Sequence, residues 1–194
     1  TSLQATIGEE RNLFEETPEH CRQITLKKPI ITNADIHKLA NNTQTGLKAH
    51  KIQILFDISD DNGLKNAVQR TQEEADEAIR KGCSILILSD RGVDRHTAAI
   101  PSLLATSSLH HHLIRNGTRT KVGIVVETAE AREVTHFALL IGYGAGAINP
   151  YLAFETLENQ LNKNALIPGM TRSSVITNYL TAANKGILKI MSKM

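Results

Sequence analysis

Four short apolar runs spaced along the middle of the chain most constrain what it can fold into. They are rich in β-branched residues, and each gap between them holds a segment of helical period. Strands that alternate with helices form successive βαβ units and a parallel sheet. Because the runs are continuously apolar, we expect both faces of that sheet to be covered. The predicted strands are Ile52–Phe56, Ser84–Leu88, Val122–Val126 and Ala147–Ile148.

The segments between the runs carry helix signals of their own. Over Leu64–Lys81 apolar residues recur at i, i+3, i+4 and i+7, and Asp76 with Arg80 forms a favourable i, i+4 pair, as does Glu77 with Lys81. The predicted helices are Leu64–Lys81, Pro101–Asn116, Ala131–Ile141 after a Thr128 cap, and a segment that follows Pro150. The sequence therefore predicts an α/β fold whose parallel βα units resemble a partial (β/α) barrel.

Two stretches flank these units. Residues 1–50 are irregular in pattern, with one short helix that Asn33 can cap, and we expect them to form a lead-in that packs on the domain. Residues 51–165 form the βα-repeat domain. Residues 166–194 begin with the loosened sequence Ile167-Pro-Gly169 and continue as a helical segment.

Composition excludes several classes of protein. Twenty-two Lys and Arg against 20 Asp and Glu leave a net charge of +2, too little for a protein that binds nucleic acid by neutralising many phosphates. The apolar runs are far shorter than the roughly 20 residues that cross a bilayer, and no signal-peptide pattern opens the chain. We therefore expect a cytoplasmic protein with no nucleic-acid or membrane partner.

Metal and nucleotide motifs are weak. Cys21 and Cys83 stand far apart, so neither a disulfide framework nor a zinc or iron-sulfur site is supported, and we expect structural thiols. Three consecutive histidines, His110–His112, cannot converge on one ion, because neighbouring helical residues point about 100° apart. Gly142–Gly146 lacks the spacing of a phosphate-binding loop and follows a helix. We therefore predict no metal site.

Polar residues follow the predicted strands where each strand ends. Asp57, Asp90 and Glu127 would gather at the carboxyl edge of a parallel sheet, where barrels and open sheets build their sites. One interpretation is an independent small α/β enzyme that uses these carboxylates as acid-base groups or metal ligands. The other is that they cap helices and fix the turns.

The most polar loop of the regular region, Asp90-Arg-Gly-Val-Asp-Arg-His96, follows the most apolar strand. A loop of this kind on a rigid sheet can recognise an anion or a neighbouring domain. Alternatively, Arg91 and Arg95 are neutralised within the loop by Asp90 and Asp94. The loop residues Asp90, Arg91, Gly92, Asp94 and Arg95 are thus candidates for an interdomain or structural role.

Several stretches together resemble the central domain of the large subunit of glutamate synthase, and the likeness covers nearly the whole chain. They are Ser84–Gly92, Ile100–Ala105, His110–Ile114, Glu127–Glu133, Gly142–Gly146, Asn149–Ala153, Pro18–Arg22 and Lys185–Met194.

The resemblance implies a connecting domain, architectural in role, within an enzyme that makes glutamate from glutamine and 2-oxoglutarate. In that family an amidotransferase domain releases ammonia, which passes to an FMN-binding barrel, and an iron-sulfur cluster relays electrons. Other domains of the same large subunit are then the partners. The electron donor can be a pyridine nucleotide acting through a small subunit, or ferredoxin.

The chain lacks the family's amidotransferase nucleophile and its cluster ligands. The resemblance therefore implies no catalytic residue and no cofactor bound by these residues, with FMN and the iron-sulfur cluster held elsewhere in the parent enzyme. Only Met191 and Ser192, which resemble the entry into the FMN domain, carry over as flavin neighbours. A stand-alone interaction scaffold is a further hypothesis, based on Lys185, Lys189 and Lys193 at i, i+4 and i+8.

Overall fold

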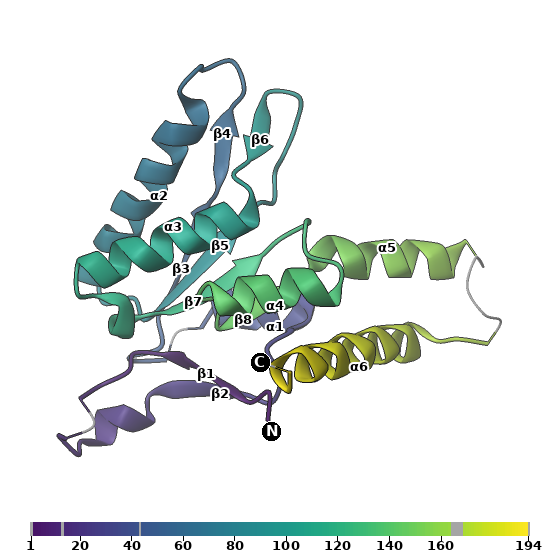
Figure 1. The fold of residues 1–194 in the computed structure, drawn as a ribbon, viewed down its shortest axis with the longest axis horizontal. Coiled ribbons are helices and arrows are strands. Elements are labelled where there is room, and N and C mark those ends of the chain that lie inside the picture. The colour runs from purple at the N-terminus through teal and green to yellow at the C-terminus, as the bar shows by residue number, and fades with distance from the viewer. Residues whose placement is uncertain (1, 13, 43, 164–168, 194) are drawn as a thin grey trace.

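A parallel sheet of four strands forms the centre of the protein. The structure, a computed structural model, describes residues 2–12, 14–42, 44–163 and 169–193. The strands lie in the order in which the chain visits them, and every neighbouring pair is parallel (Figure 1). They are β3 (Ala49–Gln53), β5 (Ile85–Ser89), β7 (Gly123–Glu127) and β8 (Ala147–Asn149). A sheet that grows in one direction matches the strand order of a (β/α) barrel. The predicted α/β fold of parallel βα units is confirmed.

A helix fills each gap between these strands, and further helices follow β8. The helices are α2 (Gly63–Arg80), α3 (Ser102–Arg115), α4 (Val134–Gly142), α5 (Tyr151–Asn162) and α6 (Arg172–Met191). The last of them packs closely on α4, because Gly186 has no side chain and a Cβ there would collide with Val134. The three helices predicted between the strands are present as α2, α3 and α4, and the helix predicted after Pro150 is present as α5. Their ends differ from the predicted ones by a few residues.

Both faces of the sheet are covered, as the apolar strands required. Alternate residues of a strand point to opposite faces. Leu86, Leu88 and Val126 belong to the larger core, which α2, α3 and α4 complete. Ile85, Ile87 and Val125 belong to a second core on the other face. The remaining members of this second core are Ile7, Ile31, Ile36, Leu39 and Ala147.

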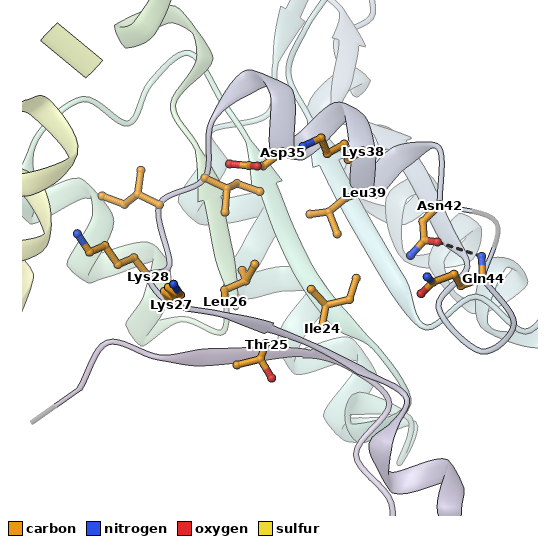
Figure 2. Close-up of a pocket in the computed structure, with 12 residues that line it drawn as sticks. Ile24, Thr25, Leu26, Lys27, Lys28, Asp35, Lys38, Leu39, Asn42 and Gln44 are labelled. Carbon is orange, nitrogen blue, oxygen red and sulfur yellow. Dashed lines mark hydrogen bonds between the residues drawn. The ribbon is translucent and has the colours of Figure 1, made fainter. Parts of the chain in front are cut away.

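The first fifty residues build this second layer and contain more regular structure than the sequence indicated. They include β1 (Ala5–Gly8), the short 3-10 helix η1 (Pro18–Cys21), β2 (Gln23–Leu26) and α1 (Asn33–Ala40). Strands β1 and β2 pair in antiparallel fashion and place Ile7 against the sheet. A groove remains between β2 and α1 (Figure 2).

The segment before α1 explains why α1 lies on the opposite face from the other helices. Ile30 bridges Ile148 in parallel, so the chain passes beside β8 and then crosses through α1 to β3 at the far edge. Parallel crossover connections are right-handed. Because this connection runs back across the sheet while the others run forward, the same hand places α1 on the other face (Figure 1).

Two helix caps differ from the sequence prediction. Thr32, not Asn33, caps α1, because its hydroxyl oxygen accepts the Asp35 backbone N–H at 3.2 Å. The Thr128 hydroxyl donates to Asp90 at 2.6 Å instead of capping, and α4 begins at Val134. The Asn33 side-chain oxygen accepts from Asn149 at 2.9 Å, so each side chain that the sequence predicted as a cap bonds to a tertiary partner instead.

Two side-chain predictions are also revised. Glu77 pairs with Lys81 at 2.6 Å as expected, but Asp76 accepts from His112 of α3 at 2.8 Å and does not pair with Arg80. Cys83 is a buried thiol, whereas Cys21 is exposed and has no packing role of that kind. No helix among the described residues is long and apolar enough to cross a membrane.

A small ribbon projects from the carboxyl edge of the sheet. It consists of β4 (Leu55–Asp57) and β6 (Thr97–Ala99), which pair in antiparallel fashion. A second 3-10 helix, η2 (Arg119–Lys121), precedes β7. The ribbon matters for the site below, because it carries one predicted carboxylate away from the other two.

Candidate functional site at the carboxyl edge of the sheet

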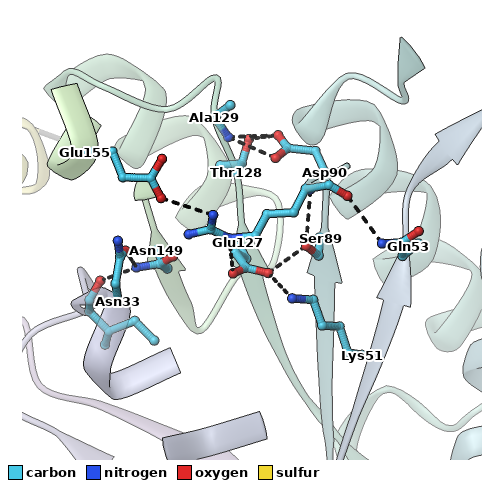
Figure 3. A network of polar contacts seen from close by, with 12 residues as sticks. Asn33, Lys51, Gln53, Ser89, Asp90, Glu127, Thr128, Ala129, Asn149 and Glu155 are labelled. Atoms are coloured by element: carbon cyan, nitrogen blue, oxygen red, sulfur yellow. Dashed lines mark hydrogen bonds and ion pairs between the residues drawn. The ribbon is translucent and has the colours of Figure 1, made fainter. Parts of the chain in front are cut away.

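The last residues of the four parallel strands form a polar row. Gln53, Ser89, Glu127 and Asn149 are register partners from β3 across to β8. Since register partners share a face, their side chains belong to the layer that α1 and the β1–β2 hairpin cover. Figure 3 shows the row with the polar contacts around it. The carboxyl edge of this sheet is therefore a polar layer directly above an apolar one.

Glu127 is the centre of the row. Its carboxylate accepts from Lys51 Nζ at 2.6 Å, from Ser89 Oγ at 2.6 Å and from Arg91 Nε at 2.7 Å (Figure 3). Its side chain is only 4% exposed. Burial favours the neutral acid, but these three donors outweigh it, and the pKa of Glu127 lies below its ordinary value. The carboxylate is thus ionised and fully engaged.

Arg91 extends the network to α5. Its guanidinium donates to Glu155 at 3.1 Å and lies over the Tyr151 ring, with its carbon 3.7 Å from the ring centroid. Burial disfavours the charged guanidinium, but Glu127 and Glu155 hold the pKa of Arg91 above its ordinary value. Burial, together with the Asp90 carboxylate, raises the pKa of the Tyr151 hydroxyl. Arg91 therefore ties the end of β5 to β7 and to α5.

Asp90 accepts a separate set of hydrogen bonds from the loop that follows β7. Its Oδ2 atom accepts from the Thr128 hydroxyl at 2.6 Å and from the Ala129 backbone N–H at 2.9 Å, and its Oδ1 atom accepts from the same N–H at 3.0 Å. The residue is 2% exposed. Asp90 therefore closes the loop after β7 onto the end of β5, and both oxygens are in use.

Asp57 does not join the other two predicted carboxylates. The predicted strand 52–56 is interrupted at the buried Ile54, whose N–H still bonds to Ser89, and the chain then leaves for the β4–β6 ribbon. Asp57 is exposed at the end of β4 and accepts from Ser59. These bonds lower the pKa of Asp57. The three-carboxylate site is therefore wrong: the sheet brings Asp90 and Glu127 to one edge and excludes Asp57.

The polar loop is not paired internally in the way that the sequence suggested. Arg91 is neutralised by Glu127 and Glu155, and Asp90 serves Thr128. Asp94 accepts from the His96 and Thr97 backbone N–H groups at 2.8 Å, which lowers its pKa and folds the loop tip on itself. Gly92 takes a φ of +102°, a conformation that favours glycine. Gly92, Asp94 and Arg95 are exposed beyond the braced edge.

Lys51 and Gln53 are members of the site that the sequence reading missed. Both lie in or beside an apolar run, at positions that alternate with the buried Ile52 and Ile54. That alternation was the available signal, because it marks one face of β3 as polar. The Gln53 side chain donates to the Arg91 carbonyl at 3.3 Å. Asn149 donates to the Ile31 carbonyl and to Asn33, and its own buried oxygen has no partner among the described residues.

These hydrogen bonds and ion pairs hold the ends of the strands and the adjoining loops in place. The oxygens of Asp90 and Glu127 are all occupied by donors, and the lowered pKa of Glu127 keeps that carboxylate ionised at neutral pH. No group of three potential metal ligands exists within the described ranges. The two cysteines of the sequence cannot supply the four thiolates that an iron-sulfur cluster requires.

The residues also do not make up a flavin site by themselves. Met191 is exposed at the end of α6, and the Ser192 hydroxyl already donates to the Lys189 carbonyl at 2.9 Å. One thioether and one engaged hydroxyl cannot cradle a flavin phosphate, which is bound by backbone N–H groups and cationic side chains. FMN therefore has no site built from these residues alone.

The fold and the site define this protein as a βα domain in which internal hydrogen bonds and ion pairs hold the carboxyl ends of the strands together. A family model described as the glutamate synthase central domain matches residues 1–194. The chain belongs to that family.

Curated relatives agree. The chain is 41% identical to the large chain of an NADPH glutamate synthase of Bacillus subtilis, and 39% identical to an NADH glutamate synthase of Schizosaccharomyces pombe. It is 40% identical to a chloroplastic ferredoxin-dependent glutamate synthase of rice. All of this chain aligns in each case, but it spans only 12%, 9% and 13% of the respective relatives.

One solved structure is also similar. A mutant of flavocytochrome b2 with benzoylformate superposes with a TM-score of 0.48 at 15% identity, over 62% of this chain and 28% of its own.

Proposed function

We propose that this chain is the connecting central domain of a glutamate synthase large chain and has no complete active site of its own. In the parent enzyme, hydrolysis of glutamine yields glutamate and ammonia. Ammonia, 2-oxoglutarate, two electrons and two protons then yield a second glutamate and water. The role of this domain is architectural: it holds the glutamine-hydrolysing and glutamate-forming centres in fixed relation.

The observation that carries the proposal is the state of the carboxyl edge. In a (β/α) fold this edge is where catalytic groups stand. Here its two buried carboxylates, Asp90 and Glu127, have every oxygen engaged by a donor from a neighbouring strand or loop. Carboxylates that are fully engaged in this way suit a rigid structural role better than a role in proton transfer.

The remaining parts of the chemistry belong to other domains of the large chain. FMN and the iron-sulfur cluster lie there, and we infer that Met191 and Ser192 mark the approach to the flavin domain. The exposed loop residues Gly92, Asp94 and Arg95 then face a neighbouring domain. Because the relatives' names include NADPH, NADH and ferredoxin, the donor is a pyridine nucleotide acting through a small subunit, or ferredoxin.

The division of the chain follows from the same proposal. Residues 1–50 are a lead-in, 51–165 the βα domain and 166–194 the segment that leads to the flavin domain. The boundary at 165/166 and the sequence Ile167-Pro168 lie outside the described residues. Placement in the cytoplasm stays a prediction, since some relatives are chloroplastic.

Two measurements test the proposal. Residues 1–194 alone, checked for folding by circular dichroism, should show neither glutaminase nor glutamate-forming turnover; turnover by that piece would overturn the proposal. In the full-length enzyme, Asp90→Asn with Glu127→Gln should lower both activities only in proportion to the folded fraction, with the KM for both substrates unchanged. Loss of turnover in a fully folded, flavin-loaded enzyme would instead indicate a catalytic role.

A further inference from the structure

The groove between β2 and α1 combines an apolar lining with a basic rim. Its volume is about 690 Å³ (Figure 2). Ile24 and Leu26 of β2 and Leu39 of α1 line it, and the same three side chains pack against the second core. The groove therefore lies directly over the sheet, where a docked segment could bury apolar side chains.

The charge of the groove is positive. Lys27, Lys28 and Lys38 line it, are exposed, and take part in none of the ion pairs between described residues. The carboxylate of Asp35 also lines the groove, but it accepts from the Thr32 N–H and hydroxyl at the start of α1. Three ammonium groups beside one engaged carboxylate favour an acidic occupant.

The β2 backbone offers a second binding feature. The hairpin has only two strands, so β2 pairs with β1 along one edge. Apart from that ladder, no backbone hydrogen bond between described residues involves Gln23–Leu26. In an antiparallel pair, alternate residues direct their N–H and C=O groups away from the partner strand. An open edge of this kind is a template for a further strand.

We propose that an extended, acidic segment of the same large chain, from outside residues 1–194, adds to β2 as a third strand and occupies this groove. Its backbone would pair with the open edge, its apolar side chains would contact Leu39, and its carboxylates would lie beside Lys27, Lys28 and Lys38. We assign the source to the large chain because this chain spans only 12% of the Bacillus relative, so most of a large chain of that kind lies outside these residues. The inference rests on the proposed role as a connecting domain.

Hydrogen exchange in the full-length enzyme tests the strand pairing. If a third strand is present, all four amides of Gln23–Leu26 exchange slowly, including the alternate ones that β1 does not hold. We expect those outward amides to exchange at least about tenfold more slowly than amides of an open edge. Slow exchange at alternate positions only would overturn the proposal.

Charge reversal tests the acidic character of the occupant. Lys27→Glu with Lys28→Glu and Lys38→Glu should release the outward β2 amides while the amides of β5 stay protected, which shows that the domain is still folded. The matched control reverses three exposed lysines elsewhere, Lys65, Lys121 and Lys185, and should leave β2 unchanged. Equal protection in the two triple variants would contradict an acidic occupant.

Carbodiimide cross-linking identifies the source. Lys27, Lys28 or Lys38 should be joined to Asp or Glu within one stretch of the large chain beyond these residues. Links to a second copy or to another protein would overturn the proposal. An enzyme that forms glutamate while β2 keeps an open edge refutes this inference alone, whereas a full-length chain without glutamate-forming activity refutes the proposed function.

Discussion

At the carboxyl edge of the sheet Arg91 is held by carboxylates, whereas at the amino edge Arg119 is held by neutral acceptors. Arg119 donates to His110 Nδ1 at 2.9 Å and to the Val122 and Gly144 carbonyls at 2.8 and 3.0 Å. These carbonyls lie just before β7 and β8. Each guanidinium therefore ties together the chain at one end of the same strands, but with different chemistry.

The two environments shift the guanidinium groups in opposite directions. Carboxylate partners outweigh burial and raise the pKa of Arg91, while burial lowers the pKa of Arg119. Burial, followed by the charge of Arg119, also lowers the pKa of His110, which keeps the ring neutral and able to accept. The stability of the carboxyl edge thus depends on pairing Arg91 with carboxylates. The stability of the amino edge depends on the close packing of Arg119 against neutral acceptors.

The largest effect is expected from a methyl group at the amino edge. Gly144 has a φ of +109°, and a Cβ there would collide with the His110 ring. Gly144→Ala should therefore displace His110 from Arg119 and lower the free energy of unfolding by about 3 kcal/mol, from backbone strain and overpacking together. Urea unfolding followed by circular dichroism measures it.

Gly142→Ala is the matched control for this variant. Gly142 is the last residue of α4, and a Cβ there would meet nothing within 4 Å. Alanine has the higher helix propensity, so this variant should be as stable as the original or more stable by up to about 1 kcal/mol. Similar losses in both variants would contradict the close fit assigned to the amino edge.

Charge removal should have the second largest effect, at the carboxyl edge. Glu127→Gln keeps the shape but leaves Lys51 and Arg91 without their shared buried carboxylate. Both cations are more than a third exposed and can turn to water, so we expect a loss of about 2 kcal/mol, below the range for fully buried pairs. Glu155→Gln removes the exposed partner of the same guanidinium and should cost less than about 0.5 kcal/mol. Equal losses would show that burial of Glu127 is not what matters.

Sequence reasoning located the sheet because burial on two faces leaves a pattern along the chain. The apolar runs that predict β5 and β7 also fix where they end, so Asp90 and Glu127 could be placed at one edge before the fold was known. Periodicity records which side of an element is buried. It does not record how far a strand stays in one sheet, and for that reason Asp57 was misplaced.

The sequence also did not indicate which polar side chains pair with one another. Asp90 has an arginine beside it in the sequence, yet it serves Thr128, whereas Arg91 reaches across 36 positions to Glu127. Short spacing favours a local pair, but a burial site shared by distant strands excludes water and makes the distant pair stronger. Lys51 illustrates the same point, because a lysine next to buried isoleucines looks solvent-facing until Glu127 is brought beside it.

The smallest effect, a dependence of stability on pH, separates the two edges by the window in which each weakens. In the unfolded chain His110 takes up a proton near pH 6.5. In the folded protein its pKa is lowered, so the ring takes up a proton only at lower pH. The amino edge therefore loses stability as pH falls below about 6.5. The pKa of Glu127 is lowered as well, so the stability that it contributes is present above its unfolded value of about 4.3 and is lost only as pH falls below that. His110→Asn, whose side-chain oxygen can accept from Arg119 without titrating, should flatten the dependence that begins below about pH 6.5 and leave the acid limb in place. Glu127→Gln should do the reverse. Unfolding midpoints measured from pH 8 to pH 3.5 would decide, and a flattened acid limb in the His110 variant would show that the two edges are not independent.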